Sequence, residues 1–220
     1  MSPLTARIAR LRLRIQRACE ACGREPGSVE LLPVSKRQDA ALVREAQALG
    51  FGRFGENYVQ EGLRKAQEVP GAEFVLIGPL QRNKAKAALG SFAQIMTVDR
   101  PELATRLRHL AAELDVVRPV WLQVDLWGEE TKVGGAGAAA LEALFGALEE
   151  DPRLPVQGFM AIPPPENPDA FLAMARLREE WRQRLGRDLR LSMGMSGDLE
   201  DAIRAGTDQV RIGTAFFGTR

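Results

Sequence analysis

One lysine of this chain is placed where an amine could act as a nucleophile. Lys36 closes the segment 29–36, VELLPVSK, whose apolar residues indicate a buried strand ending on the amine. A partly desolvated lysine can lose its proton, and only the neutral amine attacks a carbonyl to form a Schiff base, whereas arginine stays charged. A lysine that merely snorkels at a strand end is the alternative, so the rest of the chain has to supply the context.

Two loops near the C-terminus combine glycine with hydroxyl residues, which can hold anions. The first follows the segment 189–192 and leads into a helical pattern at 198–205, and the second ends the segment 208–212. Glycine lets an anion approach backbone N–H groups, hydroxyls add donors, and a helix N-terminus attracts negative charge. Ordinary turn and cap residues are the alternative for either loop alone. The loop residues that we expect beside a ligand are Ser192, Met195, Ser196, Gly213 and Thr214.

An amine and an anion cradle together indicate which ligand such a pocket would take. A Schiff-base lysine on one side and a phosphate cradle on the other describe a site for a phosphorylated aldehyde, and pyridoxal 5′-phosphate (PLP) is the obvious candidate. Arg211 lies two residues before Gly213, so the two-residue period of a strand places both on one side. Arg211 could therefore face the pyridine nitrogen of PLP.

The elements that must position these residues alternate along the whole chain. Short apolar or β-branched runs indicate strands at 29–34, 51–55, 73–77, 95–98, 119–125, 156–160, 189–192 and 208–212. Segments of helical period lie between them, at 38–49, 57–68, 82–89, 101–114, 136–149, 168–185 and 198–205. Such an alternation implies parallel strands with right-handed crossovers.

Eight strands favour closure of the sheet. A (β/α)₈ barrel typically takes about 250 residues, so we predict an α/β fold in which residues 1–220 form a single TIM-barrel domain. An amphipathic helix before the first strand would be an extra element on the outside or across the bottom, with Gly23 as its C-terminal cap. Active sites of such barrels lie at the C-terminal ends of the strands, where the residues named above gather.

The first predicted helix also carries a basic stripe and a cysteine pair. The stripe could bind RNA or a phosphate-bearing partner, but a solvated helix face is the commoner explanation. Cys19 and Cys22 have the spacing of a redox pair or of half a zinc site, yet there is no other cysteine and His109 is the only histidine. We therefore interpret them as small residues near a helix end. The stripe consists of Arg7, Arg10, Arg14 and Arg17.

Composition excludes several functional classes. The 220 residues are 45% hydrophobic, enough for a full core, and the formal net charge of +1 creates no field that would favour nucleic acid or an anionic membrane. No apolar stretch reaches the roughly 18 residues of a spanning helix, and the Arg-rich N-terminus does not resemble a signal peptide. We expect a cytoplasmic monomer.

Several longer segments resemble a known family, the pyridoxal phosphate homeostasis proteins, and the match spans nearly the whole chain. The segments, in order, are 34–36 (VSK), 54–61 (FGENYVQE), 77–84 (IGPLQRNK), 191–196 (LSMGMS), 210–214 (VRIGT) and 217–220 (FGTR). The resemblance implies a barrel like the N-terminal domain of alanine racemase, with PLP on Lys36 as an internal aldimine. By the same resemblance Arg211 would approach the pyridine nitrogen and Asn57 would line the cofactor site. The residues that would surround the phosphate are Ser192, Ser196, Gly213 and Thr214.

Three positions depart from the family pattern. Leu76 stands where a histidine is common, Asp125 replaces an asparagine, and Val133 replaces a serine. An anion at Asp125, near the barrel mouth, could alter the polarity of the site.

Family members are thought to buffer or hand over the cofactor, and no catalytic activity is firmly assigned to them. We therefore predict a non-catalytic PLP carrier whose recipients are PLP-dependent apo-enzymes. One alternative is a racemase-like enzyme that uses PLP as an electron sink, although the second domain that supplies a second base in the racemases is missing. A less favoured alternative is a Schiff-base aldolase that acts on a phosphorylated aldehyde. The basic residues that could dock an acceptor or bind phosphate transiently are Arg82, Lys84, Lys86 and Lys132.

Overall fold

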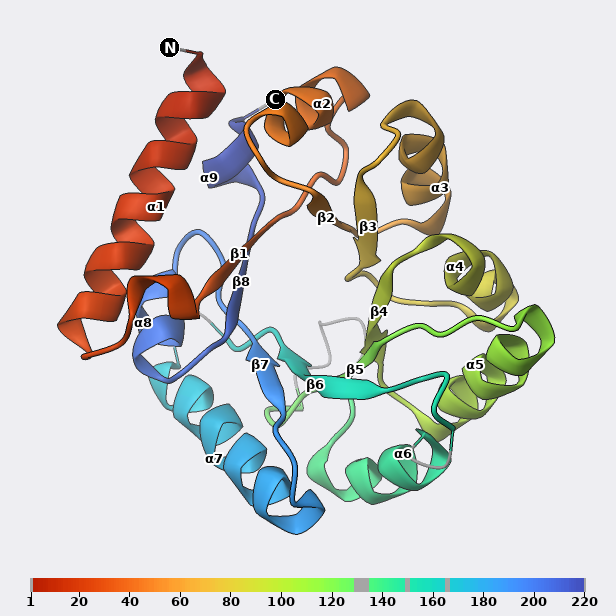
Figure 1. Ribbon diagram of the computed structural model, residues 1–220. Coiled ribbons are helices and arrows are strands. Elements are labelled where there is room, and N and C mark those ends of the chain that lie inside the picture. The colour runs from red at the N-terminus through yellow and green to blue at the C-terminus, as the bar shows by residue number, and fades with distance from the viewer. Residues whose placement is uncertain (1, 129–134, 149–150, 165–166, 220) are drawn as a thin grey trace.

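The eight predicted strands form one parallel sheet that closes into a barrel. A computed structural model describes residues 2–128, 135–148, 151–164 and 167–219, and Figure 1 shows their strands in a ring with helices outside it. The strand order is β1-β8-β7-β6-β5-β4-β3-β2, and the free edges of β1 and β2 meet at a bridge between Val34 and Gly55. The strands are β1 (Glu30–Pro33), β2 (Arg53–Glu56), β3 (Glu73–Leu76), β4 (Gln94–Val98), β5 (Val120–Val124), β6 (Val156–Ala161), β7 (Arg190–Ser192) and β8 (Gln209–Ile212).

Helices connect successive strands, as the alternation predicted. The segment 82–89 is divided between a short 3₁₀ turn at Arg82–Lys84 and an α-helix, and 136–149 begins with a 3₁₀ turn at Ala138–Ala140. The α-helices are α1 (Pro3–Ala21), α2 (Ala40–Ala48), α3 (Val59–Glu68), α4 (Ala85–Ser91), α5 (Pro101–Leu114), α6 (Leu141–Leu148), α7 (Pro168–Leu185), α8 (Leu199–Arg204) and α9 (Thr214–Phe217). No helix within the described ranges is long and apolar enough to cross a membrane.

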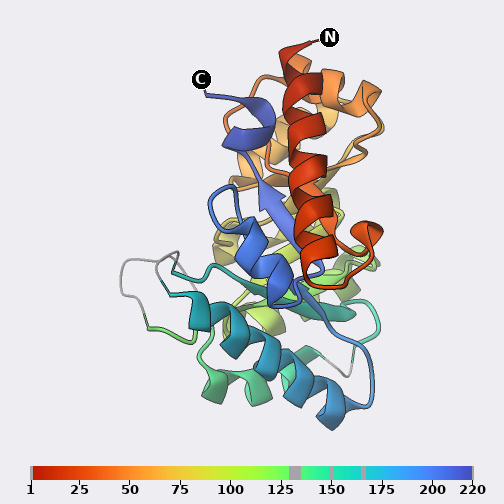
Figure 2. The same ribbon diagram turned by 90° about the vertical axis from the view of Figure 1, so that its left-hand side faces the viewer.

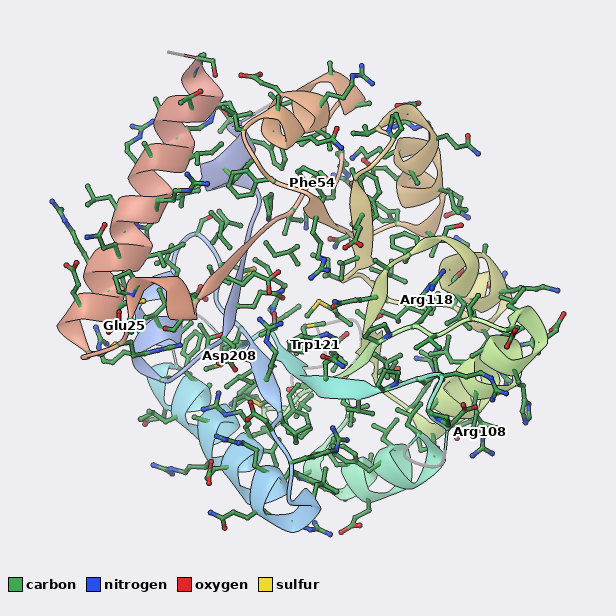
Figure 3. The ribbon with its side chains drawn as sticks, in the orientation of Figure 1. Glu25, Phe54, Arg108, Arg118, Trp121 and Asp208 are labelled. Atoms are coloured by element: carbon green, nitrogen blue, oxygen red, sulfur yellow. The ribbon has the colours of Figure 1, made fainter. Side chains whose placement is uncertain are left out.

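The strands consist of nearly continuous apolar residues in the sequence because both faces of the sheet are buried. One layer of side chains fills the inside of the ring, where Figure 3 shows Trp121. A larger core lies between the strands and the surrounding helices. A filled barrel leaves no channel, so a ligand has to bind at the ends of the strands. The inner layer consists of Leu32, Val75, Met96, Trp121 and Met160.

Helix α1 covers the outside of the barrel beside β1 and β8, the first and last strands of the chain. Among the described residues, the four-residue α9 is the only helix after β8, so no long helix covers the barrel there. Helix α1 lies alongside α8 and α9 instead (Figure 2), and Arg7 Nε donates to the carbonyl of Phe216 at 3.0 Å. The prediction of an extra helix on the outside is confirmed. Its buried stripe consists of Leu4, Ile8, Leu11, Ile15 and Cys19.

Details of α1 agree with the simpler interpretations of Gly23 and Cys19 but not with a fully solvated basic stripe. Gly23 follows the helix with a φ of 70°, the left-handed conformation of a C-terminal glycine. Within the basic stripe, Arg7 and Arg14 bind other elements of the barrel rather than facing solvent alone. Cys19 is buried in the core, where desolvation raises the pKa of its thiol, which makes it a poor nucleophile.

Candidate functional site

The structure brings the predicted site residues together at the C-terminal ends of four neighbouring strands, β7, β8, β1 and β2. Val34 N–H donates to Ile212 O at 2.9 Å, which sets the end of β1 against the end of β8, and Ser35 N–H donates to Gly55 O at 2.9 Å, which joins β1 to β2. Arg211 N–H donates to Gly194 O at 3.0 Å, which holds the loop after β7 against β8. One half of the barrel mouth therefore carries all of the predicted residues.

Lys36 lies in a tight turn just beyond the end of β1. Gln38 N–H donates to Ser35 O at 3.0 Å, and Arg37 has a φ of 57°, which is rare for a residue other than glycine. The strand is buried as predicted, but the Lys36 side chain is exposed. The turn carries Lys36 beyond the closed part of the barrel, so partial desolvation of its amine stays a prediction.

A buried group of charged residues, which sequence reasoning missed, surrounds this turn. Lys65 Nζ donates to the carboxylates of Glu56 and Glu61, at 2.7 and 2.8 Å, and to the carbonyl oxygen of Ser35 at 2.5 Å. Ser35 Oγ donates to Glu56 at 2.6 Å. Burial raises the pKa of Glu56, with hydrogen bonds from Lys65 and Ser35 acting in the opposite direction. The four-residue spacing of Glu61 and Lys65 on a helix was the signal that could have indicated a pair.

The loops after β7 and β8 offer donors that have no partner. The hydroxyls of Ser196 and Thr214 and the N–H groups of Ser196, Gly197 and Gly213 find no acceptor within the described parts of the chain. Asp198 accepts a hydrogen bond from Met195 N–H at 2.5 Å, which folds the first loop back on itself. These unpaired donors are suited to an anion with several oxygens.

Two further contacts hold the loop after β7 in place. Gly194 has a φ of 97°, and a Cβ there would lie 2.5 Å from the Cβ of Ala202, so only glycine fits. Arg14 of α1 donates to Ser196 O at 3.1 Å and pairs with Glu200 of α8. Helix α1 therefore helps to order the loop. Met195 lies on its rim with 40% of its surface exposed.

Arg211 lies inside the barrel directly beneath these loops. Its guanidinium donates to Ser192 Oγ and to the carbonyl of Ala161, both at 2.7 Å, and Ser192 Oγ in turn contacts Gln209 Oε1 at 2.8 Å. Desolvation lowers the pKa of Arg211 to about 10, an effect that Asp198 opposes, so the side chain stays a cation at neutral pH. Ser192 is thus committed to the inner network, and its expected contact with a phosphate stays a prediction.

Asn57 follows β2, so it lies on one side of Lys36 and the loops after β7 and β8 lie on the other. A Cβ on Gly78 would lie 2.1 Å from Asn57 O, so the loop after β3 packs directly against the Asn57 backbone. Asn57 Oδ1 is buried and has no hydrogen-bond partner among the described residues. It borders a pocket of about 530 Å³ that Lys84 and Arg100 also line. The predicted part of Asn57 in the cofactor site stays a prediction.

The positions that depart from the family pattern lie in different environments. Asp125 Oδ1 accepts the N–H groups of Trp127 and Gly128, at 2.9 and 3.1 Å, so its carboxylate caps a turn. Leu76 is fully buried in the core between strands and helices. Val133 lies outside the described residues, as does Lys132. Of the other basic residues, Lys84 contacts Gln60 and Lys86 pairs with Glu113 on the surface.

The closed barrel with a lysine after its first strand defines the class of the protein. The family described as alanine racemase, N-terminal domain, matches residues 7–220. The chain is 44% identical to the pyridoxal phosphate homeostasis protein of Pseudomonas aeruginosa over 225 residues, covering 100% of this chain and 97% of that protein. The protein of the same name from Escherichia coli is 40% identical over 231 residues, covering 100% and 98%. The chain therefore belongs to the alanine racemase N-terminal domain family and, within it, to the pyridoxal phosphate homeostasis proteins.

Solved structures agree with this assignment. PipY of Synechococcus elongatus, solved without PLP, is 36% identical with a TM-score of 0.83, and the match covers 93% of this chain and 99% of that one. The same protein solved with PLP bound gives a TM-score of 0.81. Alanine racemase of Clostridium difficile, at 12% identity and a TM-score of 0.75, shares the fold over 96% of this chain and 56% of its own length.

Proposed function

We propose that this chain binds PLP in the cytoplasm and serves vitamin B6 homeostasis by holding the cofactor and handing it over, without efficient catalysis. The relatives reported above are named for that role, and PipY has been solved with PLP bound. The observation that carries the proposal is the position of Lys36 beside two loops with unpaired donors, on adjacent strand ends. An amine next to an anion cradle fits a phosphorylated aldehyde.

PLP would supply an aldehyde, and Lys36 would supply the amine. The neutral Nζ attacks the aldehyde carbon, and loss of water leaves a C=N bond to Lys36. When the amine of an acceptor attacks the same carbon, the bond to Lys36 breaks and the lysine returns to its free form. Because the exchange is reversible, the cofactor can pass to PLP-dependent apo-enzymes, which we propose as the recipients.

The other site residues would anchor and orient the cofactor. Ser196, Gly213 and Thr214 have donors free for the phosphate, and Met195 would border it. Asn57 would line the far side, and Ser192 would act through its contact with the Arg211 guanidinium.

Arg211 would face the pyridine nitrogen as a permanent cation. A guanidinium beside that nitrogen disfavours its protonation, which weakens the cofactor as an electron sink. A two-base racemase also needs a proton-transfer group on each face of the cofactor, and the chain's one tyrosine, Tyr58, is exposed and contacts Arg37. Weak side activity from Lys36 itself is compatible with the proposal.

We also propose that the chain acts as one domain and as a monomer. A single closed sheet and one continuous outer core support the single domain. The exposed large apolar side chains lie on separate elements, which supports the monomer. These side chains are Leu13, Tyr58, Val117, Leu172 and Met195.

The test is the visible absorbance of the protein after incubation with PLP, before and after borohydride, followed by mass analysis of the Lys36 peptide. We expect an imine band that borohydride removes and a reduced pyridoxyl group on Lys36. Lys36→Ala should lose the band, whereas Lys86→Ala, which removes a surface lysine paired with Glu113, should keep it. A protein that stays colourless and unmodified with PLP would contradict the proposal and favour the aldolase-like alternative, which has no resting chromophore.

A further inference from the structure

We propose that Glu56, Glu61 and Lys65, which we call the turn clamp, are positioning residues that hold the 35–38 turn and thereby aim the amine of Lys36. This inference rests on the proposed function, because it assigns a purpose to the direction of that amine. The hydrogen bonds of the turn clamp to the turn go to Ser35 and Arg37, the two neighbours of Lys36 in the chain.

The turn clamp grips the chain on both sides of Lys36. On the N-terminal side, Lys65 Nζ binds the carbonyl of Ser35 at 2.5 Å, and Glu56 accepts the Ser35 hydroxyl at 2.6 Å. On the C-terminal side, Glu61 accepts the backbone N–H of Arg37 at 2.5 Å. Lys65 joins the two sides because it also binds both carboxylates. Ser35 and Arg37, the residues immediately before and after Lys36, are therefore both linked to the buried ammonium group of Lys65: Ser35 directly and Arg37 through Glu61.

The energetic cost of this arrangement indicates that stability alone does not explain it. The side chains of Lys65 and Glu56 are both 0% exposed, and Glu56 Oε2 has no hydrogen-bond partner among the described residues. Apolar residues of similar size would often be as stable as such a buried pair. The turn also keeps Arg37 at a φ of 57°, a strained conformation that persists only where neighbouring contacts impose it. Here the imposing contact is the one from Arg37 N–H to Glu61.

Aiming matters for Lys36 because its side chain is exposed and has four rotatable bonds. Its own packing does little to direct Nζ, so the position of its Cα has to restrict where the amine can reach. A reacting group displaced by about 1 Å can lose about a hundred-fold in rate. A backbone held on both sides limits that displacement before the cofactor arrives.

The test compares Glu61→Ala, Glu61→Gln and the control Glu68→Ala, a carboxylate on the same helix that pairs with Arg64 on the surface. Two quantities are measured on the full chain: hydrogen exchange of the Arg37 amide without PLP, and the rate at which the imine band grows after PLP is added. We expect Glu61→Ala to remove the protection of the Arg37 amide from hydrogen exchange. The same variant should lower the growth rate of the imine band by about ten-fold or more. Glu61→Gln keeps an acceptor and should stay near the wild-type rate, as should Glu68→Ala.

The two measurements separate the possible failures. Lost Arg37 protection with an unchanged rate would overturn the aiming role, as would a slow rate shared by Glu61→Gln and Glu61→Ala. Exchange that rises equally in distant strands such as β5 would show general destabilisation and would also overturn it. If the wild-type chain forms no imine band, the proposed function fails instead, and this case is recognised because no variant then differs from wild type in colour.

Discussion

Two ionic clusters at opposite ends of the barrel use the same kinds of charged residue in different surroundings. The turn clamp lies at the C-terminal ends of the strands with Lys65 and Glu56 fully buried. The second cluster, which we call the floor cluster, consists of residues that begin their strands and keep 31–54% of their side-chain surface exposed. It consists of Glu30, Arg53, Glu73 and Arg190.

The difference between the clusters shows that buried charges hold the backbone in position, whereas exposed charges serve mainly solubility. Exposed pairs gain little because water competes for both partners, so the floor cluster can change at small cost. Charges without access to water must keep their partners, since removing one leaves the other buried and unpaired. The end of the barrel that carries Lys36 is thus the end where charged contacts are hard to replace.

The largest effect that we expect comes from removing the buried cation. Lys65→Met keeps the length of the side chain but leaves Glu56 buried without its ionic partner, and we expect a loss of about 3–5 kcal/mol in the free energy of unfolding. Urea denaturation at neutral pH measures it. Lys86→Met, which breaks an exposed pair with Glu113, is the matched control and should cost less than about 1 kcal/mol. Equal losses in the two variants would break the comparison.

The pH dependence of Glu56 provides a second test. Its pKa is raised in the folded state above the unfolded value of about 4.3, so the folded chain binds this proton more tightly. That contribution to stability is present below about pH 4 and is lost as pH rises through the folded-state pKa. Glu56→Gln should therefore become more stable relative to wild type between pH 4 and pH 8, as measured by urea midpoints. A constant difference across that range would contradict the raised pKa.

Glu200 should show the opposite trend. Its pKa is lowered, first by the hydrogen bond from Arg14, so its contribution is present above the unfolded value of about 4.3 and is lost as pH falls through the folded-state pKa. Glu200→Gln should cost about 1 kcal/mol or less at pH 7, because the pair is partly exposed and solvent screens it. The cost should shrink toward pH 3 in chemical denaturation. A cost that grows on acidification would reverse the assignment.

The smallest effect belongs to the floor cluster. Arg53 contacts Glu73 at 2.8 Å and Glu30 at 3.8 Å, with 36% of its side chain exposed. Arg53→Ala should lower the free energy of unfolding by no more than about 1 kcal/mol, and added salt should reduce the difference. Thermal melts at two ionic strengths measure this. A salt-independent loss as large as that of Lys65→Met would show that the two ends of the barrel do not differ.

Most of the fold could be predicted from the sequence, because the apolar runs of the strands and the helical period of the segments between them are both clear. Each of the eight predicted strands was found within about two residues of its place, and the helix Pro101–Leu114 was found with the predicted bounds. The helix at Thr214–Phe217 was missed, because four residues are too few to show a helical period. Gly213 and Thr214 were expected in the loop after the last strand, and no element was predicted at 215–217.

The candidate site was predicted in part. Its location followed from the barrel rule, which places functional residues after the strands. The exposure of Lys36 and the engagement of the Ser192 hydroxyl with Arg211 and Gln209 did not follow, since neither depends on sequence spacing. The turn clamp escaped for the same reason: Ser35 and Lys65 are 30 residues apart along the chain and meet only through the closure of β1 onto β2.

The sequence by itself determined the family, the order of strands and helices, and the residue types at the strand ends, because these depend on local patterns of polarity and on motifs read in order. Tertiary structure alone decided which strand ends are neighbours and which charges are buried. It also made α1, far from β8 in the chain, the helix that orders the loop at Ser196. The physical reason is that burial and hydrogen bonding depend on distances in space, which the closing of the barrel sets between residues that the chain keeps far apart.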